Sequence, residues 1–230
     1  MNESQFELDH SISREDLLQN ISKFTDWGGQ SWTHLTRHAL SKVGSLESKQ
    51  ILEIGSRFGK MSGLFALLGA QVTALETDAS AIPLAQKLAD DWGVSSRISF
   101  LHYDGDLSHC AALKGRQFDI IFSKSVLVLL CDGLPRFLQG LNELLVSDGR
   151  YIFLENAYGG KIFGLMRCLR YRQWHIRGIE YFTRFHLQLV SQILGIEEVK
   201  KVVSPPDLPH CGSQAIRRFS AMSSFSSLSS

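Results

Sequence analysis

The chain has 230 residues, of which 44% are hydrophobic and 20% are charged, and its formal net charge is +1. This length suits one large domain that buries a core without disulfides. The near-neutral balance argues against non-specific nucleic-acid binding as the main activity, since that activity relies on a strongly basic surface.

The cysteines are widely spaced and form no C-x-x-C pair, which leaves no obvious zinc motif and suits free thiols in a reducing compartment. They are Cys110, Cys131, Cys168 and Cys211. The residues at 1–7 are polar and acidic, unlike a signal peptide. The longest apolar run, 120–130, is interrupted by polar residues and is too short to cross a bilayer. We therefore expect no transmembrane segment and a cytoplasmic location.

Apolar residues at helical spacing over 11–24 predict a first helix, and Ser31 can cap a second helix that runs to about Val43. His34 and His38 lie one turn apart on the second helix. They could bind a metal or supply a base, but no third ligand lies nearby, so a polar helix face is the alternative. We predict no metal site. Trp27 and Trp32 are interpreted as packing residues.

From residue 50 onward, short apolar runs alternate with helical stretches of crossover length. The runs lie at 51–54, 71–75, 98–101, 118–122 and 150–154. The helical stretches lie at 59–69, 79–91 and about 134–146. This alternation predicts an α/β fold with a doubly wound, mostly parallel sheet and helices on both faces.

The stretch 51–62 reads as a strand, a tight turn bounded by Gly55 and Gly59, and the start of a helix. Glycines let a ligand approach the main chain, and the helix aims free N–H groups at whatever lies above the turn. A P-loop needs four residues between its first glycine and its Gly-Lys pair, but only three lie between Gly55 and Gly59. A dinucleotide fingerprint needs a glycine where Arg57 stands. The remaining pattern is an acid, Glu53, followed by Gly-x-x-x-Gly.

This pattern resembles the first motif of class I S-adenosylmethionine-dependent methyltransferases, and the following elements agree with it. The strand 71–76 ends in Glu76 about 20 residues on, the usual spacing for a ribose-binding acid. The stretches 97–105, 118–125 and 141–155 resemble the third strand, the fourth strand with its loop, and the helix–turn–fifth strand. The resemblance covers about residues 50–156.

The resemblance implies a seven-stranded Rossmann-like sheet with an antiparallel edge strand, and S-adenosyl-L-methionine as cofactor. In such a site Glu53 would orient the turn, Glu76 would accept from the ribose hydroxyls, and Asp104 would accept from the adenine amino group. The alternative for each acid is a strand-end residue that caps a neighbouring turn. The full implied cofactor site is Glu53, Gly55, Ser56, Gly59, Glu76, Thr77, Asp104, Gly105 and Ser123.

We expect a helical cap over 1–48, a cofactor-binding domain over 49–219 with a lid-like insertion at 157–180, and a disordered Ser-rich tail over 220–230. The two final strands are expected at 196–203 and 213–219, after a helix at 180–194. The stretch 161–177 carries five basic residues and no acid. Three interpretations stay open for it: a lid for an acidic substrate, a membrane-surface helix, or a solvated face.

Two departures from the family pattern bear on the chemistry. Arg57 must carry a large side chain out of the turn, towards either the cofactor carboxylate or solvent. The loop at 123–126 reads Ser-Lys-Ser-Val and lacks the Asn/Asp-Pro-Pro-Tyr/Phe motif, which counts against a flipped base or an amide as acceptor. No histidine follows at 127–130, so a base must come from elsewhere, with His34 and Glu155 as candidates.

The predicted function is methyl transfer from S-adenosylmethionine to a small metabolite whose acceptor atom stays open, with no nucleic-acid partner and an open oligomeric state. An acidic metabolite is expected only if 161–177 forms the lid. The alternative is a methyltransferase-like binding or scaffold domain without turnover, which Arg57 would favour. A nicotinamide-dependent oxidoreductase is disfavoured because the middle glycine of the fingerprint is missing.

Overall fold

The computed structural model describes residues 13–25, 29–130, 133–157, 184–195, 198–203 and 215–222. Its α-helices are α1 (Arg14–Gln19), α2 (Gly29–Val43), α3 (Lys60–Leu67), α4 (Ile82–Asp91), α5 (Leu134–Asn142) and α7 (Arg184–Leu194). Its strands are β1 (Gln50–Ile54), β2 (Gln71–Glu76), β3 (Ile98–His102), β4 (Phe118–Lys124), β5 (Leu145–Ala157), β6 (Glu198–Val203) and β7 (Ala215–Met222). Short 3-10 helices occur at Ile21–Lys23, Ser95–Arg97, Leu107–His109, Ala111–Leu113 and Leu127–Leu129.

The first five strands form the parallel sheet that the sequence predicts. Strands β3, β2, β1, β4 and β5 lie side by side in that order, and each neighbouring pair is parallel. The chain order reverses between β1 and β4, because β1 pairs with β2 on one side and with β4 on the other. Ligands bind outside the carboxyl ends of the strands at such a switch point.

At the far side of the sheet, β5 is followed by an antiparallel pair of strands. Strand β7 is antiparallel to both β5 and β6, so it lies one place inside the edge, and β6 takes the edge position. The two strands of an antiparallel pair offer β5 the same backbone donors and acceptors, so the sequence pattern could not decide which one it would bind. Strand β7 also extends to Met222, so residues 220–222 belong to the sheet and not to the predicted tail.

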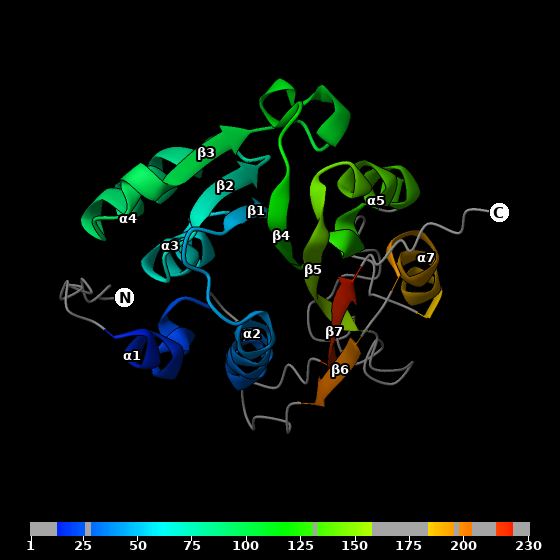
Figure 1. Ribbon diagram of the computed structural model, residues 1–230, viewed down its shortest axis with the longest axis horizontal. Helices are drawn as coiled ribbons and strands as arrows, with labels where there is room; N and C mark the ends of the chain where they lie inside the picture. The colour runs from blue at the N-terminus through cyan, green and yellow to red at the C-terminus, as the bar shows by residue number, and fades with distance from the viewer. Residues whose placement is uncertain are drawn as a thin grey trace, which may run out of the picture.

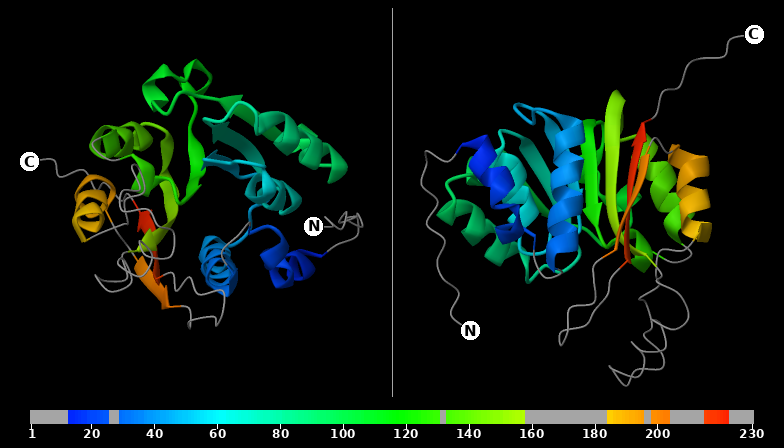
Figure 2. Two further views of the ribbon diagram at one scale, coloured as in Figure 1. Left: turned by 180° about the vertical axis from the view of Figure 1, so that it is seen from behind. Right: turned by 90° about the horizontal axis from the view of Figure 1, so that it is seen from below.

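Two apolar clusters cover the two faces of the sheet, and Figures 1 and 2 show the helices divided between them. Helices α1 to α4 pack on one face, where Ile51 of β1 and Ile152 of β5 point. Helices α5 and α7 pack on the other face, where Leu52 and Phe153 point. Successive strand residues alternate between the clusters, as the pleat requires. This arrangement confirms helices on both faces.

The N-terminal helices are part of the core. Helix α2 packs against β5, β7 and β6, and it buries Trp32 and Leu35 completely. The burial of Trp32 confirms its predicted packing role, whereas Trp27 lies outside the described residues. Arg14 donates to the carbonyl of Gly44 (2.6 Å) and Arg150 to that of Lys42, so two guanidinium groups bind the C-terminal end of α2.

Two predicted boundaries are wrong. Helix α2 begins at Gly29, so Ser31 lies inside the helix and does not cap it. Helix α5 ends at Asn142 and β5 already begins at Leu145, whereas the sequence predicted helix to about residue 146 and strand from 150. The apolar residues at 144–146 fit either periodicity, and a register shift between Phe118 and Ile120 of β4 accommodates the longer strand. The expected lid at 157–180 lies outside the described residues, apart from Ala157 at the end of β5.

Helical glycines on the two faces give a test of the packing. A methyl group at Gly63 of α3 would overlap the ring of Trp92, whereas at Gly140 of α5 it would meet Leu107 at an ordinary 3.8 Å. Gly63→Ala should lower the free energy of unfolding by about 1–3 kcal/mol through overpacking. Gly140→Ala should raise it by up to about 1 kcal/mol, because alanine favours the helix. Urea denaturation measures both, and an equal effect at the two positions would contradict the packing described.

Candidate cofactor site

The turn between β1 and α3 has the backbone conformation for which the sequence pattern selects glycine. Gly55 (φ +74°) and Gly59 (φ +75°) are left-handed, and a Cβ atom at Gly55 would lie 2.7 Å from Val126 Cγ2. At Gly59 it would lie 3.0 Å from both Ala85 and Phe100. The turn is therefore packed tightly from below, and α3 starts directly after it with its free N–H groups facing the carboxyl end of the sheet.

Arg57 occupies the same turn with φ +48°, a conformation that costs a non-glycine residue roughly 1–2 kcal/mol. Its side chain is exposed and its guanidinium carbon lies 5.1 Å above the ring centroid of Phe58. The turn thus carries the large side chain of Arg57 outward to solvent.

Glu53 lies buried at the end of β1 and accepts a hydrogen bond from the hydroxyl of Ser62 on α3. This contact joins the strand to the first turns of the helix across the Gly55–Gly59 loop. The role that the family resemblance implies for Glu53, orienting the turn, stays a prediction.

Glu76 at the end of β2 binds the main chain of two loops. Its Oε2 accepts from the N–H of Arg57 (2.6 Å), and its Oε1 accepts from the N–H groups of Thr77 (2.8 Å) and Asp78 (2.9 Å). Glu76 is buried, whereas Thr77 is exposed beside it. Each carboxylate oxygen can accept more than one hydrogen bond, so capping the loops leaves Oε2 acceptor capacity for a ligand hydroxyl.

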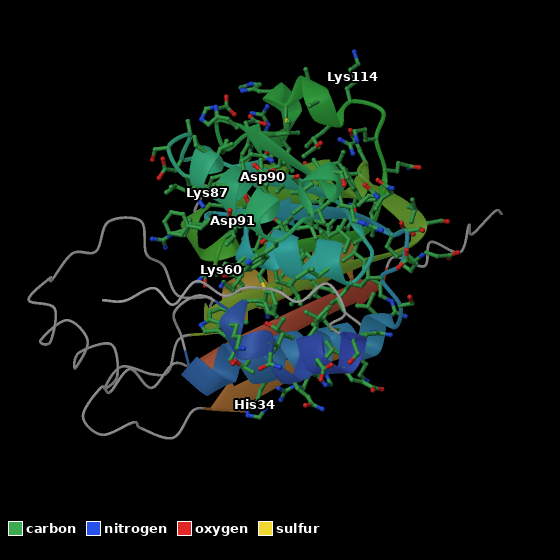
Figure 3. The ribbon with its side chains drawn as sticks, turned by 90° about the vertical axis from the view of Figure 1, so that its left-hand side faces the viewer. His34, Lys60, Lys87, Asp90, Asp91 and Lys114 are labelled. Carbon is green, nitrogen blue, oxygen red and sulfur yellow. The ribbon has the colours of Figure 1, made fainter. Side chains whose placement is uncertain are left out.

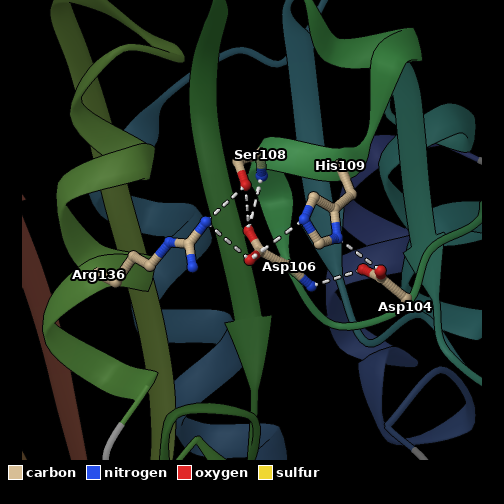
Figure 4. A network of polar contacts seen from close by, with 5 residues as sticks. All are labelled: Asp104, Asp106, Ser108, His109 and Arg136. Carbon is tan, nitrogen blue, oxygen red and sulfur yellow. Dashed lines mark hydrogen bonds and ion pairs between the residues drawn. The ribbon is translucent and has the colours of Figure 1, made fainter.

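Asp104 and Gly105 lie in the loop after β3, next to the Glu76 loop. The side chain of Asp104 is 56% exposed and accepts from the N–H of Asp106 (2.9 Å) and from Nδ1 of His109 (2.7 Å). These contacts are drawn in Figure 4. Gly105 has φ +98°, and nothing would approach a Cβ atom there within 4 Å. The hydrogen bond from His109 holds the pKa of Asp104 below its ordinary value, so this acid is ionised at neutral pH.

Two buried hydroxyl groups flank the turn without a partner in the described part of the chain. They are Oγ of Ser56, in the turn itself, and Oγ of Ser123, near the end of β4. Ser123 pairs in register with Ile54 of β1, so both hydroxyls lie near the carboxyl ends of the central strands. Buried polar groups are normally satisfied, so a pair of unpartnered hydroxyls here fits a site that a polar ligand completes.

The two candidate bases, His34 and Glu155, lie in different surroundings: His34 is exposed and Glu155 is buried. His34 is exposed on α2, and Figure 3 shows it at the rim of the molecule, well apart from Lys60 at the start of α3. Glu155 is fully buried, and its Oε1 accepts from the N–H groups of Val126 (3.0 Å) and Leu127 (2.9 Å). Glu155 thus holds the loop after β4 that lies against Gly55.

A lysine that sequence reasoning passed over stands at this end of the sheet. Lys124 is the last residue of β4, and its Nζ lies 5.6 Å from the ring centroid of Trp32 on α2. Strand alternation puts Lys124 on the same face as Phe122, which belongs to the apolar cluster that α1 to α4 cover. That alternation was readable from the sequence, but the contact with α2 required the tertiary structure.

Ionisation of the neighbouring groups follows from burial. Burial raises the pKa of the Tyr103 phenol to about 12, and the nearby Glu76 charge adds to the rise. Tyr103 therefore stays neutral over the physiological range.

Over the described ranges, no group of three or more His, Cys, Asp or Glu residues is placed to bind a metal, and no helix is long and apolar enough to span a membrane.

The parallel five-stranded sheet, the glycine-bounded turn and the acid at the end of β2 are the features on which the sequence resembles class I S-adenosylmethionine-dependent methyltransferases. Comparison with known families agrees, because residues 52–153 match the family described as a methyltransferase domain. Over these residues the match confirms the resemblance drawn from the sequence.

Individual relatives are distant. Release factor glutamine methyltransferase of Chlorobaculum tepidum is 36% identical over 91 residues, covering 39% of this chain and 31% of the relative. Ubiquinone biosynthesis O-methyltransferase of Ruegeria sp. is 28% identical over 141 residues, covering 59% and 53%. The chain spans between 31% and 64% of the length of these and the other curated relatives that it matches.

Solved structures match more of the chain at lower identity. An S-adenosylmethionine-dependent methyltransferase from Mesorhizobium loti has a TM-score of 0.64 and 19% identity, covering 85% of this chain and 99% of the other. Magnesium protoporphyrin IX methyltransferase from Synechocystis, solved with bound SAH, has a TM-score of 0.62 and 15% identity, covering 94% and 100%. These similarities establish the fold.

Glu155 provides a test of what its carboxylate does. Glu155→Ala leaves two buried N–H groups without their acceptor, at roughly 1–3 kcal/mol each, so the free energy of unfolding should fall by about 2–5 kcal/mol. Glu155→Gln keeps an acceptor oxygen and should lower the free energy of unfolding much less. Urea denaturation compares the two variants. Loss of turnover in a fully stable Glu155→Gln protein would instead restore Glu155 as the base.

Proposed function

We propose that this protein transfers a methyl group from S-adenosyl-L-methionine to a small acidic molecule. The observation that carries the proposal is the closely packed turn at 55–59, with Glu76 binding its main chain and two hydroxyls beside it that have no partner among the described residues. Its setting in a matched methyltransferase domain supports this cofactor over a dinucleotide.

The residues present fit such a cofactor. In this proposal Gly55, Ser56 and Gly59 would line its methionine portion and Glu53 would keep the turn in shape. Glu76 with Thr77 would bind the ribose hydroxyls, Asp104 with Gly105 would bind the adenine, and Ser123 would lie beneath the reacting group. When bound, the sulfonium supplies an electrophilic methyl group for a one-step displacement. The protein contributes positioning, which can lower such a barrier by roughly 7–11 kcal/mol.

We propose that the acceptor atom is an oxygen that reacts without a general base. Curated relatives that cover 59% and 73% of the chain are named O-methyltransferases, which supports oxygen. Neither His34, exposed at the rim, nor Glu155, engaged with the 126–127 main chain, is well placed as a base. A carboxylate oxygen is already ionised at neutral pH, so it requires neither residue.

Lys124 supports an acidic acceptor independently of the 161–177 stretch, which lies outside the described residues. Its ammonium group lies over Trp32 at the carboxyl end of β4, beside the loop that would lie beneath the methyl group. A cation held there would attract and orient a carboxylate or phosphate. The lid interpretation of 161–177 stays a prediction, as do the cytoplasmic location and the absence of a nucleic-acid partner. We also propose that the seven strands form the sheet that is typical of this class.

Calorimetry with S-adenosylmethionine and S-adenosylhomocysteine tests the proposal directly, and we expect binding of both and none of NAD. Glu76→Gln should weaken binding about tenfold or more, because a charge-assisted hydrogen bond to a ribose hydroxyl contributes roughly 1.5–3 kcal/mol. Asp90→Asn, which removes an exposed carboxylate on α4, is the matched control and should bind as the wild type does. Unchanged affinity in folded Glu76→Gln protein would reject the ribose assignment.

Lys124 gives a separate test of the acceptor class. Lys124→Met keeps an apolar stem against Trp32 and removes the charge, so the KM for an acidic acceptor should rise roughly tenfold, as expected for one lost charge-assisted contact. Affinity for S-adenosylhomocysteine should stay the same. Lys114→Met, on an exposed loop, is the control. An unchanged KM across a panel of carboxylate and phosphate acceptors would refute the role of Lys124.

A further inference from the structure

The loop after β3 holds a chain of polar contacts, shown in Figure 4, and beyond Asp104 the proposed chemistry gives its members no role. It begins at Asp104, whose two carboxylate oxygens have different donors. Oδ1 accepts from the N–H of Asp106 (2.9 Å), and Oδ2 accepts from Nδ1 of His109 (2.7 Å). A carboxylate can only accept, so Nδ1 must carry the proton.

His109 is itself held in place by its neighbours. Asp106 caps the 3-10 helix at Leu107–His109, because its Oδ1 accepts from the N–H of Ser108 (2.9 Å) and its backbone carbonyl from the N–H of His109 (3.2 Å). On its other side the imidazole Nε2 lies 3.9 Å from Oδ2 of Asp106. The ring is thus positioned between two carboxylates.

Arg136 of α5 completes the chain from the far side. Its Nη2 lies 3.1 Å from Oδ2 of Asp106 and donates to Oγ of Ser108 (3.0 Å). Figure 4 shows the guanidinium reaching from α5 to the Asp106–Ser108 pair, with His109 and Asp104 beyond it. The orientation of Asp104 therefore depends on a helix on the opposite face of the sheet from α4.

These contacts are poor candidates for a purely stabilising role. The side chains of His109, Asp104 and Arg136 are 63%, 56% and 71% exposed, and exposed ion pairs contribute little to stability. Their geometric effect is larger than their energy. A carboxylate with one donor on each oxygen cannot rotate freely, and each oxygen keeps a lone pair for a further donor.

We propose that His109 is a positioning residue that orients the Asp104 carboxylate for recognition of an exocyclic amino group on the cofactor's purine. The inference rests on the proposed function, because it takes Asp104 to be the residue that meets the adenine. Arg136 acts through Asp106 and His109 and touches no ligand. The consequence is selectivity for adenine over a purine that carries a carbonyl oxygen at the same position, since an oriented carboxylate repels that oxygen.

The charge of His109 adds a pH dependence. The hydrogen bond to Asp104 and the charges of Asp104 and Asp106 raise the pKa of His109 above its ordinary value, against a smaller opposing effect of Arg136. The ion pair therefore stabilises the fold at low pH, and this contribution is lost as pH rises through the raised pKa. Above that pH, neutral His109 can still donate from Nδ1, but it no longer neutralises Asp104. Affinity for adenine should then increase by roughly two- to threefold, a modest effect because exposed charges are screened.

The test compares Kd values for S-adenosylhomocysteine and S-inosylhomocysteine, in which a carbonyl replaces the amino group, by calorimetry between pH 5.5 and 8.5. His109→Ala should reduce the preference for the adenine ligand by roughly three- to tenfold, the size expected when a hydrogen-bonding site loses its orientation. His109→Asn places an amide donor where Nδ1 was, so it should keep the preference and lose the pH dependence. Arg136→Gln should reduce the preference by less, and Lys114→Gln is the control for loss of one cation.

The outcomes separate this inference from the proposed function. Failure of wild-type protein to bind either ligand would overturn both. Binding of S-adenosylhomocysteine with the same preference in wild type, His109→Ala and His109→Asn would overturn the role of His109 alone. A purely structural role would weaken both ligands equally in His109→Ala and lower its melting temperature, which also overturns the inference.

Discussion

The site depends on the contact between the Glu76 carboxylate and the main chain of two neighbouring loops. One carboxylate oxygen binds the N–H of Arg57 in the β1–α3 turn, and the other binds Thr77 and Asp78 in the β2–α4 loop. The N–H groups of Gly55 and Ser56 both donate to the carbonyl of Leu75, which reinforces the same junction. These contacts fix the position of the turn relative to β2.

A second strand-end acid plays a comparable part on the other side of the turn. Glu155 binds the N–H groups at 126 and 127, and this loop sets Val126 against Gly55. Each of the two buried acids therefore fixes a loop beside the β1–α3 turn by accepting from backbone N–H groups. Asp104 is held in a similar way but remains exposed, so its orientation depends on His109 and on Arg136 of a distant helix.

Helix α2 links the carboxyl end of β4 to the rest of the core. Its buried face packs on β5, β7 and β6, and Trp32 near its start lies beneath the ammonium group of Lys124. Two arginines bind its C-terminal end. The N-terminal segment therefore does more than cover the domain: it is a layer of the core that also brings an aromatic ring to the carboxyl end of the sheet.

The sequence by itself determined the five parallel strands, the helices on both faces and the glycine turn with its acids, because those features follow from local periodicity and from backbone conformations that only certain residues adopt. It could not determine that Glu155 accepts hydrogen bonds from the 126–127 main chain, or that Arg57 points outward. Nor could it determine that His109 contacts Asp104 directly and that Arg136 contacts Asp106 beside them. It also misjudged the start of α2 and the α5–β5 boundary, and it left open which of β6 and β7 lies at the edge. Each of these depends on contacts between residues far apart in the chain, and only the tertiary structure brings such residues together.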